Sequence, residues 1–107
     1  MQDGLYSVSF QTPSAAGAGV IVKNGNSVAG GDSAFAWFGE MSDDGATLAG
    51  SLQVVKHGTS MVSVFGHLTD FVLTYTGSFD GGSATLTATT SSAPGVRMTI
   101  NLRPLKV

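Results

Sequence analysis

Apolar and polar residues alternate with a period of two along much of this chain of 107 residues. Such alternation is typical of β-strands that bury one face and expose the other. Residues 4–10 show it clearly, with Tyr6, Val8 and Phe10 on one face and serines on the other. Strand-like segments, alternating or rich in β-branched residues, follow at residues 18–22, 27–31, 33–41, 46–56, 71–76, 83–90 and 96–103. The pattern therefore predicts eight short strands.

Within this pattern, residues 33–41 are apolar on both faces, with Trp37 on one face and Phe38 on the other. We expect a strand that is covered on both sides, because large aromatic side chains are mostly buried. A contact at a protein interface is the alternative for these two rings.

A tight hairpin turn between two of the strands is predicted across Lys23-Asn24-Gly25-Asn26, with Asn24, Gly25 and Asn26 as its structural residues. Asn-Gly predicts a type I′ turn, which needs two residues at positive φ. Residues 42–45 and 79–82 predict two more turns, because Ser and Asp side chains accept backbone hydrogen bonds and Gly adopts positive φ freely.

Residues 57–70 break the period of two. Apolar residues recur there at helical spacing, at Met61, Val64, Phe65 and Leu68. Ser60 is a candidate N-cap and Gly66 a candidate stop. The segment predicts one short helix or helical turn.

Together these elements predict an all-β protein of one domain, residues 1–107. Strands joined by tight turns form an antiparallel meander. Eight twisted strands with one apolar face usually close into a barrel, which leaves no exposed sheet edge. Such a barrel is just wide enough to be filled by side chains or to hold one small ligand. Several inward positions are small, so we expect room for an apolar ligand.

Composition narrows the functional classes. Charged residues make up 11% of the chain, the net charge is -2 and there is no cysteine. A nucleic-acid surface needs a stripe of Lys and Arg, which this chain lacks. Without cysteine there is no disulfide or thiolate chemistry. No leader pattern precedes Gly4 and no run approaches the length of a membrane span, so we expect a cytoplasmic protein.

Candidate chemistry is sparse. His57 and His67 lie too far apart in sequence for a paired zinc motif. His67 and Asp70 would couple on a helical turn, but no nucleophile elbow surrounds any serine. We therefore expect no enzyme, no metal and no cofactor, with a hydrolase built on His67 and Asp70 as the outside alternative.

Ser42, Asp43, Asp44 and Gly45 hold the densest acidic pair of the chain. Adjacent side chains on a turn diverge, so the pair does not suit acid–base catalysis. A solvated turn is the simplest interpretation, and a small contact patch for a basic protein is the alternative.

The order of these motifs resembles the GrlR-like negative regulators of type III secretion. Members begin with Asp-Gly-x-Tyr-Ser, which residues 3–7 match, and continue with a Gly-x-Gly strand, matched by residues 17–19. An Ile-x-Lys-Asn-Gly-Asn hairpin and a Gly-Gly-Asp turn follow, matched by residues 21–26 and 30–32. The match covers roughly residues 1–45. Beyond them, only the spacing of the predicted strands is similar.

The resemblance implies a lipocalin-like β-barrel with one helix that often pairs as a homodimer. It implies a non-enzymatic protein that binds and represses a transcriptional activator without touching DNA. An acidic run carries that contact in the family's founding type, and its counterpart here is Ser42-Asp43-Asp44-Gly45, with only two carboxylates. Such barrels also suggest the alternative of a carrier for an apolar or lipid-like ligand.

Overall fold

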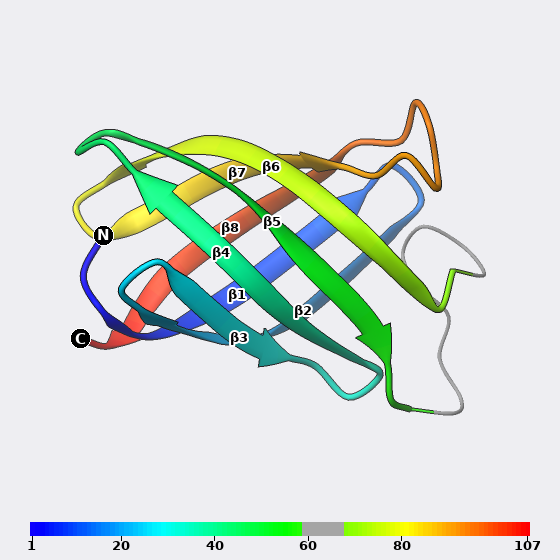
Figure 1. Cartoon of the computed structure of the whole chain (residues 1–107), viewed down its shortest axis with the longest axis horizontal. Helices are drawn as coiled ribbons and strands as arrows, with labels where there is room; N and C mark the ends of the chain where they lie inside the picture. Colours follow the sequence, from blue (N-terminus) through cyan, green and yellow to red (C-terminus); the bar gives the residue numbers. More distant parts are fainter. Residues whose placement is uncertain (59–67) are drawn as a thin grey trace.

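The computed structural model describes residues 1–58 and 68–107. Eight antiparallel strands follow one another around a closed barrel, in which β8 pairs back to β1 (Figure 1). The predicted all-β fold and meander order are confirmed. The helix predicted from Ser60 to Gly66 falls outside the described residues. The strands are β1 (Gly4–Thr12), β2 (Ala15–Asn24), β3 (Ser27–Gly31), β4 (Phe35–Asp43), β5 (Thr47–Lys56), β6 (Asp70–Asp80), β7 (Ser83–Thr89) and β8 (Met98–Lys106).

The barrel buries one face of each strand, as the period of two predicts. Tyr6, Leu48 and Tyr75 are the largest side chains that are fully enclosed. The expectation that both faces of residues 33–41 are covered is wrong, however. Trp37 points into the barrel, whereas Phe38 lies on the outer surface and is 48% exposed. A meander closed on itself has nothing outside to cover it, so an apolar outer face stays in contact with solvent.

Inward glycines stand opposite large side chains on neighbouring strands. Gly50 on β5 pairs with Tyr75 on β6. A Cβ added to Gly50 would lie 2.7 Å from the Tyr75 hydroxyl oxygen and would overlap the backbone carbonyl of Glu40. Alternation of small and large residues lets bulky side chains fill a narrow barrel. The same pairing recurs in Phe10–Gly17, Trp37–Gly30, Leu52–Gly39 and Leu86–Gly77.

The β2–β3 hairpin differs from its prediction in turn type. Asn24 pairs with Ser27, so the two central residues are Gly25 and Asn26. Gly25 has a φ of 63°, and no described residue other than glycine has positive φ. Positive φ at the first central residue alone is the requirement of a type II′ turn, so the predicted type I′ turn is wrong. Lys23, which the sequence placed in the turn, belongs to β2 and is buried.

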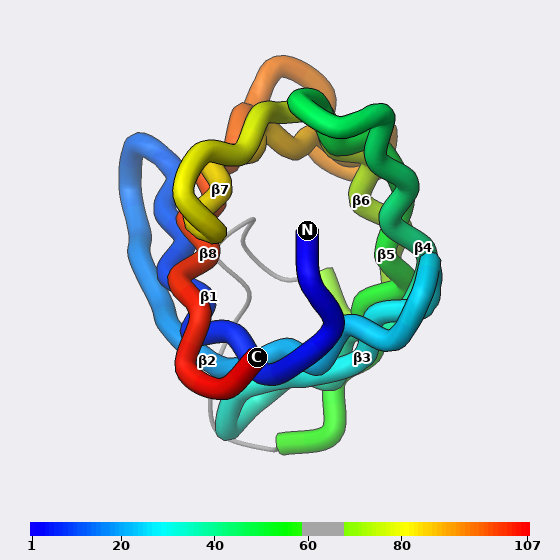
Figure 2. The backbone as a smooth tube through the Cα atoms, turned by 90° about the vertical axis from the view of Figure 1, so that its left-hand side faces the viewer, coloured from blue at the N-terminus to red at the C-terminus, as the bar shows by residue number. Residues whose placement is uncertain are grey.

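The two ends of the barrel are built differently. The β2–β3, β4–β5 and β6–β7 turns gather at one end with both chain termini (Figure 1). Viewed along the barrel from this end, the first residues run across the inside of the ring of strands (Figure 2). The β1–β2, β3–β4 and β7–β8 connections lie at the opposite end. The N-terminal residues therefore cover part of this end of the barrel.

Candidate functional site

A cavity of about 110 Å³ lies inside the barrel. Every strand except β3 contributes to its described wall, which is almost entirely apolar. Ala16, Gly17, Asp32 and Ala34 line it near the β1–β2 and β3–β4 connections. The cavity therefore reaches toward the end of the barrel opposite to the chain termini.

Aromatic rings form much of the cavity wall. Phe10 and Trp37 meet edge to face, with ring centroids 5.5 Å apart and an interplanar angle of 88°. Phe35 and Phe71 make a second edge contact, with centroids 6.4 Å apart at 64°. Such contacts hold rings in defined orientations, because the positive edge of one ring attracts the negative face of the other. Both contacts involve a ring of β4, so this strand presents two oriented aromatic rings to the cavity.

Tyr75 and Asp32 bring a hydroxyl and a carboxylate to the described wall of the cavity, and both groups are already bonded. The hydroxyl of Tyr75 donates to the carbonyl oxygen of Glu40 at 2.6 Å, and burial raises the pKa of Tyr75 far above its usual value. Asp32 Oδ1 accepts the backbone N–H groups of Ala34 and Phe35 at 2.8 and 2.7 Å. Asp32 thus serves as the cap of the β3–β4 connection and also places a carboxylate at the cavity rim.

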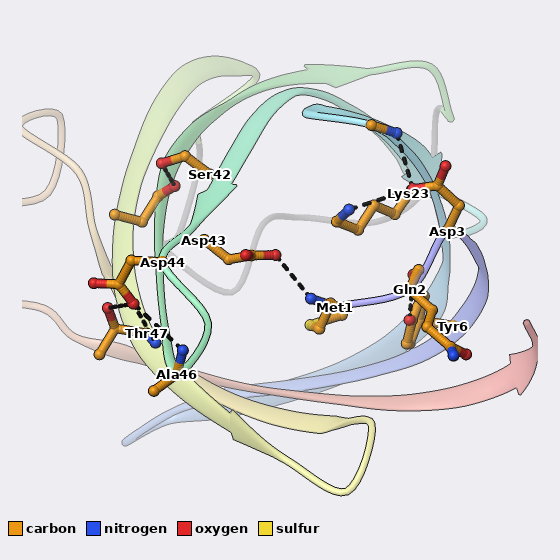
Figure 3. A network of polar contacts seen from close by, with 12 residues as sticks. Met1, Gln2, Asp3, Tyr6, Lys23, Ser42, Asp43, Asp44, Ala46 and Thr47 are labelled. Atoms are coloured by element: carbon orange, nitrogen blue, oxygen red, sulfur yellow. Dashed lines mark hydrogen bonds and ion pairs between the residues drawn. The ribbon is translucent and has the colours of Figure 1, made fainter.

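Two ion pairs attach the N-terminal residues at the opposite end of the barrel (Figure 3). The amino group of Met1 bonds Asp43 Oδ2 at 2.7 Å, and Lys23 Nζ lies 3.3 Å from Asp3 Oδ1. Asp3 also accepts the N–H of Gly25 at 2.9 Å. This backbone hydrogen bond, followed by Lys23, lowers the pKa of Asp3, and the bond from the Met1 amino group lowers the pKa of Asp43. The N-terminal residues are therefore attached to the ends of β2 and β4.

The predicted contact residues Ser42, Asp43, Asp44 and Gly45 do lie together at this end. Asp44 Oδ1 accepts the hydroxyl and the N–H of Thr47 at 2.7 and 3.0 Å, and these bonds lower its pKa. The Ser42 hydroxyl donates to Ala49. Both carboxylates thus have intramolecular partners, and Asp44 shapes the β4–β5 turn in the way that its sequence predicted.

The two histidines of the sequence differ in whether the structure describes them. His57 Nε2 lies 2.9 Å from the carbonyl oxygen of Asp32, and His67 is outside the described residues. In residues 1–58 and 68–107 no three His, Cys, Asp or Glu side chains group as a metal site would require. No helix in the same part of the chain is long and apolar enough to cross a membrane.

The sequence placed Trp37 in the core correctly and predicted room for an apolar ligand, but it did not identify the residues that line the cavity or the place of Asp32 at its rim. Alternation shows which side chains point inward, yet not how much space they leave. The small residues Gly17 and Ala34 were the available signal. How much space these small residues leave depends on the side chains of the opposite strands, which the sequence of one strand does not reveal.

No protein-family model matches the chain, and no curated protein matches it. The closed barrel of eight antiparallel strands is compatible with lipocalin-like folds. The resemblance of residues 1–45 to the GrlR-like regulators stays a prediction.

Proposed function

We propose that this protein binds a small apolar ligand inside its barrel. The observation that carries the proposal is the apolar cavity of about 110 Å³. Interiors of small proteins are normally packed with few voids larger than a water molecule. A void of this size forfeits packing contacts along its walls, and an apolar ligand restores them.

The chemistry of the wall favours an apolar occupant over water. A buried water needs two to four polar partners, and in the described wall the Tyr75 hydroxyl and Asp32 Oδ1 are engaged in protein hydrogen bonds. A dry cavity of roughly 150 Å³ lined by Leu, Ile and Phe binds benzene or xenon. The present cavity is of the same order, which limits the ligand to a small molecule or to one end of a larger one.

Thermal unfolding in the presence of toluene tests this function. At ten times its Kd a ligand adds about 1.4 kcal/mol of stability, or roughly 6–10 °C in Tm for a domain of this size. Val8 lines the cavity opposite to Gly19, so Val8→Phe should fill it and abolish the shift. Val20→Phe makes the same change on the outer surface and should keep the shift. No shift with the wild-type protein would contradict the proposal.

Repression of a transcriptional activator, as the resemblance implies, is the second proposed function. The exposed position of Asp44 in the β4–β5 turn supports it. Asp44→Asn removes the charge but keeps an oxygen that accepts the Thr47 bonds, whereas Asp44→Lys also reverses the charge. If the contact depends on charge, less activator should co-purify from the native host with Asp44→Asn than with the wild-type protein, and none should co-purify with Asp44→Lys. Equal recovery with all three proteins would exclude this contact.

The homodimer that the resemblance implies also stays a proposal. The outer residues Val22, Ala29, Phe38 and Val72 lie in one row of strand register, with Gln53 between the last two. Rows of exposed apolar residues are typical of association surfaces. Phe38→Glu should therefore reduce any dimer seen by analytical ultracentrifugation, whereas Thr87→Glu on the polar face of β7 should not. A monomer in the wild-type protein would exclude the dimer.

A further inference from the structure

We propose that the cavity selects a neutral molecule with a single aromatic ring, a selectivity that rests on the ligand-binding function proposed above. Three features of the described wall carry this inference: the aromatic side chains that line it, its volume, and the charge at its rim.

The first feature is the number of aromatic rings around so small a space. Phe10, Phe35, Trp37, Phe71 and Tyr75 all line the cavity. An aromatic ligand among these rings gains edge-to-face attraction in addition to the burial of its surface. A saturated ring of similar size is buried equally well but has no quadrupole, so it gains burial alone. The wall should therefore distinguish benzene from cyclohexane.

Methionine strengthens this preference. Met41 and Met98 also line the cavity, and both are buried. Their thioether sulfurs are polarizable and make favourable contacts with the edges of aromatic rings. Methionine side chains also adapt to the shape of an occupant, which lets a planar ring fit a wall made of curved strands.

The second feature is size. The cavity has about three-quarters of the volume of a cavity that holds one benzene molecule, which is roughly 150 Å³. One ring fits if side chains adjust slightly at the rim, where Phe10 is only partly buried. Two fused rings exceed the space. The volume therefore sets the limit at one ring.

The third feature is the charge of the rim. The Asp32 carboxylate lines the cavity at the end away from the termini, and its Oδ1 is fixed by two backbone N–H donors. No lysine or arginine is among the described residues of the wall. A carboxylate of a ligand would meet like charge without a compensating cation, which disfavours binding. A neutral ligand avoids this repulsion.

A matched trio of probes tests the proposal: benzene, cyclohexane and benzoate. Trp37 is the single tryptophan and lies in the wall, so its fluorescence reports occupancy. We expect benzene to bind about tenfold more tightly than cyclohexane, and benzoate to bind at least about tenfold more weakly than benzene. Equal binding of benzene and cyclohexane would overturn the aromatic selectivity while leaving the ligand-binding function intact. Binding of none would overturn both.

Two variants locate the selectivity in the wall. Phe10→Leu removes one ring while keeping an apolar side chain, and it should reduce the preference for benzene over cyclohexane several-fold. Phe38→Leu makes the same change on the outer surface and should leave the preference unchanged. Asp32→Asn keeps an oxygen for the cap of the β3–β4 connection and should raise the affinity for benzoate alone. Unchanged benzoate binding in Asp32→Asn would overturn the role of the rim charge.

Discussion

Substitution of Gly50 by alanine should destabilise the barrel strongly. Gly50 faces inward on β5, where it pairs with Met41 of β4 and Tyr75 of β6. The added Cβ would overlap the carbonyl oxygen of Glu40 and come within 2.7 Å of the Tyr75 hydroxyl. Overpacking of a core costs about 1–3 kcal/mol. The upper end applies here, because one obstacle is backbone held in the sheet rather than the flexible end of a side chain.

A loss of about 3 kcal/mol lowers Tm by roughly 12 °C or more for a domain of this size. Circular dichroism melts of Gly50→Ala measure this directly, and Ser51→Ala on the outer face of the same strand serves as the control. Adding Tyr75→Phe to Gly50→Ala separates the two obstacles. We expect the double variant to stay destabilised, since the Glu40 carbonyl remains. A Tm for Gly50→Ala within about 2 °C of wild type would refute the reasoning.

The remaining predictions concern the hairpin and the titration of buried and bonded groups. Gly25→Ala should cost about 1–2 kcal/mol in chemical denaturation, because it forces a side chain to positive φ, whereas Asn26→Ala beside it should be nearly neutral. The pKa of Asp44 is lowered by folding, so its contribution to stability is present above about pH 4 and is lost as pH falls through the folded pKa; Asp44→Asn should flatten this part of the acid unfolding curve. The pKa values of Tyr6 and Tyr75 are raised by burial, so stability that is present below about pH 10 falls as pH rises further. Tyrosinate absorbance should therefore appear at higher pH in the folded protein than in the unfolded chain, and tyrosine ionisation at its ordinary pKa in the folded protein would contradict the burial argument.

Much of the fold could be predicted from the sequence because the period of two is a local property. Each strand needs only its own residues to show which face is apolar, and a closed meander follows from short connections. The predictions were wrong where the burial of a residue depends on other segments of the chain. Phe38 stays exposed because no second layer of described residues covers the sheet there, and Lys23 is buried because Asp3 provides its partner.

The turn type and the cavity are harder to predict from the sequence. The sequence Asn24-Gly25-Asn26 is compatible with both a type I′ and a type II′ turn. The pairing of Asn24 with Ser27 makes Gly25 and Asn26 the central residues and so selects the type II′ turn. The cavity depends on how inward side chains from seven strands meet. The cavity volume is the small difference between the volume that the strands enclose and the volume that the inward side chains fill. Composition does not determine this difference.

Xenon binding followed by methyl NMR tests the central claim, that the barrel holds an accessible apolar cavity. Xenon occupies dry cavities and makes no demand on polar partners. We predict saturable shifts of the methyl signals of Val8, Leu73 and Ile100, which line the cavity, with no saturable shift of Val20 on the outer surface. Unshifted inner methyl groups, or equal and linear shifts of inner and outer ones, would contradict the account.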